Sequence, residues 1–236
     1  MDEVRHFLRY TLPGLSAVIQ LLIGLSITDS GIVCKILSAK DLTQSLGIIL
    51  AIFIGSGGLG YLFANIYFSL YWSWPFSRLI AIDHLILLKD LRKEIIEIVD
   101  FSGKAYANDL SKREAWTIFT QYWHSKIKEN KKIEGINIIT DRLTDVTHGL
   151  GATFIGSLSA LVSWIVIHLS IAQSSASFIS PKIFIVFLAW AILIFMLGVA
   201  YRRTNLALQS IANTTLTDIV CTEYQAGNKI KIYYQN

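Results

Sequence analysis

The sequence predicts an all-α polytopic membrane protein with four transmembrane helices and a small helical bundle outside the bilayer. The first observation is that four long stretches contain no Asp, Glu, Lys or Arg: Thr11–Thr28, Leu46–Trp72, Thr147–Ala172 and Ile183–Tyr201. A helix needs about 20 apolar residues to cross the hydrocarbon core, and such a segment must pair its own backbone polar groups. The second observation is that charged residues gather between the second and third stretches and after the fourth. Four transmembrane helices and a polar helical domain follow.

These boundaries divide the 236-residue chain into four segments. They are an N-terminal segment with the first two spans, a helical domain, the last two spans and a helical tail, at residues 1–72, 73–146, 147–201 and 202–236. The first span is expected to be retained and not cleaved as a signal peptide. Asp2 and Glu3 stand where a signal peptide carries basic residues.

The distribution of Lys and Arg predicts the orientation. An even number of spans places both termini and residues 73–146 on one side, with 18 of the 21 basic residues. Counting only the basic residues close to the spans leaves 11 on that side against 3 opposite. The positive-inside rule therefore predicts cytoplasmic termini. A composition rich in Ile, Lys and Asn suggests an AT-rich bacterial genome, and the expected location is the bacterial inner membrane. In this orientation Cys34 lies in an outer loop and Cys221 in the cytosolic tail, so they cannot pair.

The domain at 73–146 is expected to contain three helices. Apolar residues of the first recur at helical spacing, at Leu87, Leu91, Ile95 and Ile98. Ser111 and Glu114 form a capping box that opens the second. The apolar stripe of this second helix is Trp116, Phe119, Trp123 and Ile127.

The third helix of this domain is predicted to begin near Ile136, after the polar turn at residues 130–135. Nothing interrupts its periodicity before Gly149, so it should run unbroken into the third span. The fourth span should likewise continue past Arg202 into the tail. Long helices would then connect the cytosolic bundle with the membrane.

The third span carries the main packing signal. Two neighbouring rows of small residues run along it, Gly149, Thr153 and Ser157 beside Ala152, Gly156 and Ala160. Small residues let helix backbones approach closely in lipid. The rows either pack the span within the four-helix bundle or face an identical subunit and line an oligomeric interface or pore. Among polar side chains inside the spans, Gln20 and Asn65 are expected to form hydrogen bonds between helices.

A second group of polar residues lies at the membrane boundary below the third span. Asp141, Asp145 and His148 are spaced to share one face of a helix. Two carboxylates and an imidazole could bind a divalent metal or relay a proton. The alternative is a solvated face whose carboxylates pair with basic neighbours such as Arg142. No catalytic motif, dedicated metal-ligand spacing or cofactor signature accompanies these residues, so we expect no enzyme and no cofactor.

Two resemblances bear on function. The run from Gly149 to Gly156 resembles the glycine- and threonine-bearing span of the MotA/TolQ/ExbB proton-channel family, and the order of spans is similar to the MotA layout. This resemblance implies an ion-channel subunit in which Thr153 faces the channel and a partner protein supplies the carboxylate. The family's Pro-rich approach to this span is absent. Separately, Arg and His separated by five residues, in the pairs Arg78–His84 and Arg142–His148, resemble the motif of HEPN ribonucleases.

The neutral spans and their small-residue faces predict a homo-oligomeric channel, pore or membrane effector, gated by the domain at 73–146. In layout alone the chain resembles membrane components of bacterial anti-phage systems. One alternative is a non-conducting anchor that recruits a cytosolic protein partner through residues 73–146. The others are the MotA-like channel subunit and a metal-dependent enzyme at the membrane boundary. The lipid bilayer is the expected contact of the spans. The net charge of +4 fits a surface near anionic lipid, and no nucleic-acid binding is expected.

Overall fold

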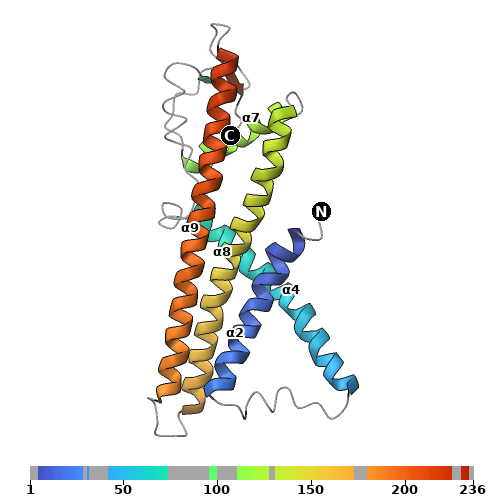
Figure 1. The fold of residues 1–236 in the computed structure, drawn as a ribbon, viewed down its shortest axis with the longest axis vertical. Coiled ribbons are helices and arrows are strands. Elements are labelled where there is room, and N and C mark those ends of the chain that lie inside the picture. Colours follow the sequence, from blue (N-terminus) through green and yellow to red (C-terminus); the bar gives the residue numbers. More distant parts are fainter. Residues whose placement is uncertain are drawn as a thin grey trace. The chain divides into compact units, whose positions relative to one another are not determined.

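The computed structural model confirms the predicted fold class (Figure 1). It describes residues 5–28, 31, 42–73, 96–99, 111–127, 131–172, 180–224 and 230–233. Within these residues, four helices are long and apolar enough to cross a membrane, at Phe7–Thr28, Leu50–Trp72, Ile133–Ser170 and Pro181–Tyr224. The predicted contact with a lipid bilayer follows from them. Cys34, Arg78 and His84 lie outside the described residues.

The elements follow one another as the π-helical turn η1 and helix α2, then α4, β1, α7, α8, α9 and β2. Their bounds are Phe7–Thr11, Leu12–Thr28, Leu42–Trp72, Ile96–Val99, Lys112–Ile127, Lys131–Ala172, Pro181–Tyr224 and Ile230–Tyr233. The chain forms two compact units. The first comprises residues 1–70 and 145–202, and the second comprises residues 71–144 and 203–236.

Helices α8 and α9 each contribute to both units because each is a single continuous helix, as the sequence periodicity predicts. Helix α8 begins at Lys131, earlier than the predicted start near Ile136. A helix tolerates Gly135 at a penalty of about 1 kcal/mol relative to Ala. Glu134 in the first turn favours a helix start there, since an acidic side chain stabilises the positive end of the helix dipole.

In the first unit, α2 with η1 crosses α4 with the two backbones in direct contact (Figure 1). A Cβ on Gly14 would overlap the carbonyl oxygen of Ser56, and one on Gly60 would overlap the carbonyl oxygen of Tyr10. The two contacts are reciprocal, since each helix offers a glycine to a carbonyl of the other. This crossing therefore requires glycine at both positions.

Apolar side chains fill the remaining space between the spans of the first unit. The buried cluster consists of Ala17, Leu25, Phe63, Ala160, Trp164, Val186 and Trp190. Outside it, α9 exposes large apolar side chains along its spanning part, among them Phe184, Phe195 and Met196. Such a surface suits contact with lipid tails, since apolar groups on a membrane span need no further burial.

In the second unit, α7 begins with the predicted capping box. The backbone N–H of Ser111 donates to Glu114 Oε2 at 2.7 Å, and the N–H of Glu114 donates to Ser111 Oγ at 3.3 Å. Phe119 and Trp123 of the predicted stripe are buried, whereas Trp116 is 38% exposed. The buried face is formed by Ala115, Ile118, Phe119, Tyr122 and Trp123. It packs in one core with residues of α9 and both strands.

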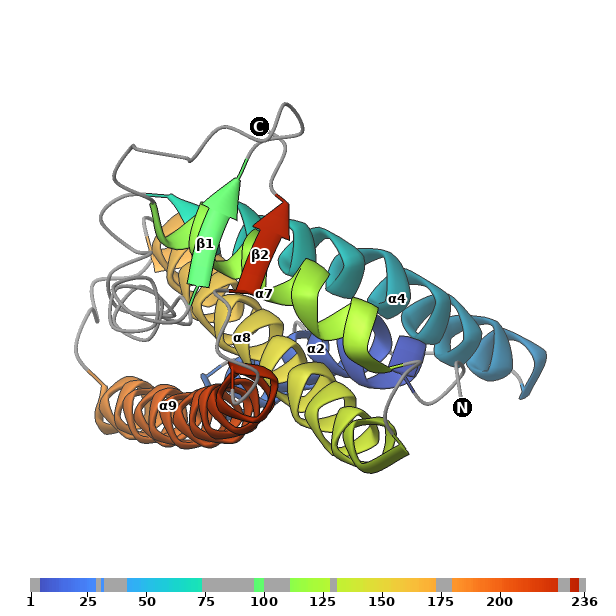
Figure 2. The same cartoon turned by 90° about the horizontal axis from the view of Figure 1, so that it is seen from above.

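The helix predicted from Leu87 to Ile98 is wrong at its end, because residues 96–99 form strand β1. This strand pairs in parallel with β2, with Ile98 opposite Ile232 and Glu97 opposite Lys231 (Figure 2). Both isoleucines are buried in the core of the second unit. A short β-branched run favours a strand once a partner strand is available, and that partner lies more than a hundred residues away. Leu87, Leu91 and Ile95 lie outside the described residues.

Candidate functional site

Polar groups line the contact between α2 and α8 along its whole length. On the α2 side they recur every three or four residues with small residues between them: Arg5, Arg9, Pro13, Ser16, Gln20, Gly24 and Thr28. This spacing keeps them on one face of a helix. Their contacts on α8 are made by Asp145, Gly156, Ser157 and Trp164, and Gly149 of α8 lies against the neighbouring Leu8 carbonyl. We call these two sets of residues, together with His168, the polar seam; all of them belong to the first unit.

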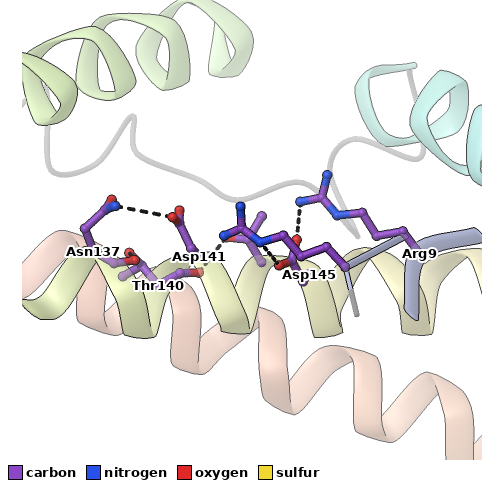
Figure 3. Close-up of polar contacts among 7 residues, drawn as sticks. Arg9, Asn137, Thr140, Asp141 and Asp145 are labelled. Atoms are coloured by element: carbon purple, nitrogen blue, oxygen red, sulfur yellow. Dashed lines mark hydrogen bonds and ion pairs between the residues drawn. The ribbon is translucent and has the colours of Figure 1, made fainter. Parts of the chain in front are cut away.

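One end of the polar seam is an ion triplet around the buried carboxylate of Asp145. Arg5 Nε lies 2.8 Å from Asp145 Oδ2, and Arg9 Nη2 lies 2.5 Å from Asp145 Oδ1 (Figure 3). The Asp145 side chain is 5% exposed, whereas those of Arg5 and Arg9 are 43% and 31% exposed. The contact at Oδ1 is a charge contact and not an aligned hydrogen bond, and the buried Arg9 Nε has no hydrogen-bond partner among the residues that the structure describes. Removing one partner of a buried ion pair destabilises strongly, because the other charge stays uncompensated.

The π-helical turn η1 follows from Pro13. Proline has no N–H and its ring crowds the carbonyl four residues earlier, so an α-helix cannot pass through it undisturbed. The N–H of Leu12 donates to the carbonyl of Phe7, five residues back. The Leu8 carbonyl therefore receives neither of the usual helical donors, and it lies 2.8 Å from where a Cβ of Gly149 would be. The turn thus directs a backbone carbonyl at α8, next to the ion triplet.

Gln20 is the hydrogen-bonding centre of the polar seam. Its Nε2 donates to Ser16 Oγ at 2.7 Å and to Ser157 Oγ at 3.0 Å. Its Oε1 accepts from Trp190 Nε1 at 3.0 Å. The amide thus joins α2, α8 and α9, as expected for a polar group within a span.

The far end of the polar seam contains aromatic rings and an imidazole. Trp164 Nε1 donates to Thr28 Oγ1 at 3.3 Å. The ring of His168 stacks on Trp164 with 5.8 Å between centroids, and its buried Nε2 has no hydrogen-bond partner in the described part of the chain. A Cβ on Gly24 would lie 2.7 Å from the indole ring of Trp190, so the ring packs directly on the glycine backbone. Tight packing therefore closes this end.

The predicted acidic group is divided among different partners. Asp141 Oδ2 accepts from Asn137 Nδ2 at 3.3 Å (Figure 3). His148 Nδ1 lies 3.3 Å from the hydroxyl of Tyr67, which lies 3.0 Å from that of Tyr201. Asp145 is buried and paired with Arg5 and Arg9, which corrects the alternative of a solvated face. In the ranges that the structure describes, no three His, Cys, Asp or Glu side chains could hold a metal ion together.

The small-residue rows of α8 lie inside the chain. Ala152, Ser157 and Ala160 are buried. A Cβ on Gly156 would lie 3.0 Å from the ring of Phe63 and 3.1 Å from the carbonyl of Pro13. The remaining hydroxyl in the rows, that of Thr153, donates to the Gly149 carbonyl of its own helix at 2.8 Å. These rows pack against α2 and α4 of the same chain.

Asn65 differs from Gln20. Its Nδ2 donates to the carbonyl of Tyr61 on its own helix at 2.9 Å, and its side chain is exposed. Among the described residues the Asn65 side chain thus bonds within its own helix, and the expected bond between helices stays a prediction for Asn65. The helical period alone could not reveal this, since the glycine crossing with α2 determines which face of α4 turns inward.

The sequence interpretation also missed Arg5 and Arg9, the partners of Asp145. Both were counted only as charges that set the orientation. Their spacing of four residues, just before a span and on the face that later carries Gln20, was an available signal. On the same side of the membrane, Asp145 was likewise the carboxylate closest to the third span.

The polar seam contains hydroxyl, amide and backbone carbonyl groups. The ion triplet lies at one end of it, and the rings of Trp164 and His168 lie at the other. Such groups can hydrogen-bond water and transfer protons, or replace part of the hydration shell of a small cation, when the helices separate. No protein-family model, curated protein or solved structure matches the chain. The proposed function is therefore argued from the residues of the chain itself.

Proposed function

We propose that the protein is a membrane channel in its closed state, and that the polar seam is the route that opens. The observation that supports this most is the length of the polar seam. From Asp145 to His168 it extends along α8 for about 35 Å at 1.5 Å per residue, which exceeds a hydrocarbon core of about 30 Å. Apolar side chains suffice to pack helices in lipid, and polar groups inside spans commonly mark ion or proton pathways.

In this proposal the observed state is closed by packing. The donors and acceptors of the Gln20 side chain are occupied by Ser16, Ser157 and Trp190. Water can enter only if α2 moves away from α8, which breaks these bonds. The triplet of Arg5, Arg9 and Asp145 also opposes that movement, because separation would leave the buried carboxylate of Asp145 without its counter-charges, and it acts as the gate.

We place the ion triplet on the cytoplasmic side of a bacterial inner membrane, with both termini in the cytoplasm. The positive-inside count supports this orientation. Asp145 stands on a helix that also belongs to the second unit, since α8 begins at Lys131. A cytosolic protein that binds the second unit can therefore act on the gate through α8.

The groups of the polar seam favour protons and small monovalent cations as the permeating species. The middle of the polar seam contains no fixed charge, and oxygen atoms predominate among its polar groups. The resemblance to proton-channel subunits points the same way. In that family a partner supplies the carboxylate, whereas here Asp145 already lies at one end of the route.

The test uses the purified full-length chain in liposomes, with proton and potassium flux as readouts. Asp145→Asn removes the charge that holds both arginines, so flux is expected to rise at least tenfold over the wild-type chain. Adding Gln20→Leu should suppress this flux, because it removes the central polar group of the route. The matched control adds Ser26→Leu instead, since Ser26 lies exposed on the outer face of α2.

Folding of each variant is checked by size-exclusion chromatography in detergent. Equal flux in the Gln20→Leu and Ser26→Leu double variants would show that ions take another route. Wild-type and Asp145→Asn chains that both remain as tight as empty liposomes would refute the channel. The non-conducting anchor would then be the better account.

A further inference from the structure

We propose that α4 binds α4 of a second copy of this chain, in parallel, through a pair of Asn65 side chains. The proposal does not depend on conduction. Asn65 lies within a candidate membrane span, and its side chain is exposed. A polar amide is therefore exposed where lipid tails are expected. One amide N–H donates to Tyr61 O. The structure records no partner among the described residues for the side-chain oxygen or the second N–H.

Lipid tails can neither donate nor accept hydrogen bonds, so an amide exposed to them lacks partners. Asn65 lies seven residues from the end of the span at Trp72, about 10 Å along the helix axis. That depth is too large for a side chain as short as asparagine to reach the headgroups. A membrane-embedded protein surface must supply the missing partners.

The same face of α4 allows a close approach. The exposed residues of this face are separated alternately by four and three positions along the chain. They are Ala51, Gly55, Gly58, Leu62, Asn65 and Ser69. An average spacing of 3.5 residues is that of helices crossing at about +20°. No atom of the described residues lies within 4 Å of a Cβ placed on Gly55 or Gly58. This face is distinct from the one that packs within the chain, where Ser56 and Gly60 are buried.

A second copy is the occupant that fits these observations. A primary amide carries both donor and acceptor, so two asparagines related by a twofold axis satisfy each other with two hydrogen bonds. The exposed face carries no charged residue that would need a complementary partner of another kind. It extends from Ala51 to Ser69, about 27 Å, which covers most of the hydrocarbon core. Glycines at the face let two short side chains meet between the helices.

Disulfide cross-linking of the full-length chain in native membranes tests this proposal. Cys34 and Cys221 are first replaced by Ser. Ala51→Cys and Leu62→Cys then place a thiol on the proposed face. Phe53→Cys is the matched control on the opposite side of α4, because Phe53 and Leu62 are equally exposed, at 51% and 52%.

Oxidation with copper-phenanthroline is expected to convert most of the Ala51→Cys and Leu62→Cys chains to covalent dimers, and at least fivefold less of Phe53→Cys. Adding Asn65→Leu should reduce the Ala51→Cys dimer at least fivefold, whereas Asn65→Gln, which keeps an amide, should retain most of it. Equal cross-linking at positions 51, 62 and 53 would overturn the proposal. So would Ala51→Cys cross-linking that is unchanged by Asn65→Leu. Neither result depends on whether the protein conducts ions.

Discussion

Replacing Gly60 with alanine should separate α2 from α4, and the effect can be worked out from the crossing. A Cβ at Gly60 would overlap the carbonyl oxygen of Tyr10 and lie 3.0 Å from the amide nitrogen of Gly14. Backbone atoms on both helices are in the way, so no side-chain rotation relieves the clash. The helices must separate by roughly 1 Å or more, and a gap of that size forfeits up to about half of the dispersion energy of the facing atoms.

Overpacking a well-packed contact destabilises by about 1–3 kcal/mol, and a clash with backbone belongs at the upper end. Alanine recovers about 0.8–1 kcal/mol through its higher helix propensity than glycine. A net loss of about 2 kcal/mol remains. If the first unit, residues 1–70 and 145–202, unfolds with the entropy per residue of a soluble domain, Tm falls by about 7 °C.

The assay is thermal unfolding of the full-length chain in detergent, followed by tryptophan fluorescence. Gly57→Ala is the matched control, three residues away on the same helix. A Cβ at Gly57 meets nothing within 4 Å, so this variant should keep or slightly raise Tm. If Gly60→Ala is as stable as Gly57→Ala, the two backbones do not touch at this crossing and the reasoning is refuted.

Two further predictions concern the second unit and the orientation. Ser111→Ala should lower the stability of the second unit by about 1 kcal/mol, because Ser111 Oγ caps α7 through the N–H of Glu114. Thr117→Ala, at a half-buried position of α7 where the hydroxyl donates to the Arg113 carbonyl of the same helix, should not, and urea unfolding monitored by circular dichroism compares the two. Cys221 is exposed, and in the proposed orientation a membrane-impermeant thiol reagent should label it only after cells are lysed. Labelling of Cys221 in intact spheroplasts would reverse the proposed orientation.

Local chemistry explains which parts of the fold could be predicted. The charge-free stretches determine the spans, because the lipid excludes charge at every position of a span. The capping box at Ser111 and Glu114 involves residues three apart, so the sequence contains the whole interaction. Strand β1 could not be predicted in this way. Its partner β2 lies near the other end of the chain, and Ile98 is buried in a core that also includes residues of helices distant in sequence.

The candidate site was predictable only in part, for a related reason. Gln20 needed a partner within the membrane, and Ser157 was already noted as one of the small residues on the third span. The ion triplet required knowing that the first and third spans are neighbours. Helical spacing grouped Asp145 with Asp141 and His148, whereas tertiary packing pairs it with Arg5 and Arg9.

The glycines of α4 show that sequence periodicity alone does not reveal which residues of a helix are buried. Gly55, Gly58 and Gly60 lie within six residues and look equivalent in the sequence. Gly60 is buried against the Tyr10 carbonyl, whereas Gly55 and Gly58 face open space. A glycine at an exposed position inside a helix is less favourable than alanine by about 0.8–1 kcal/mol. Gly55 and Gly58 therefore lower the stability of the isolated chain. That penalty is offset if the same face meets another helix closely, which is the arrangement that the amide of Asn65 also requires.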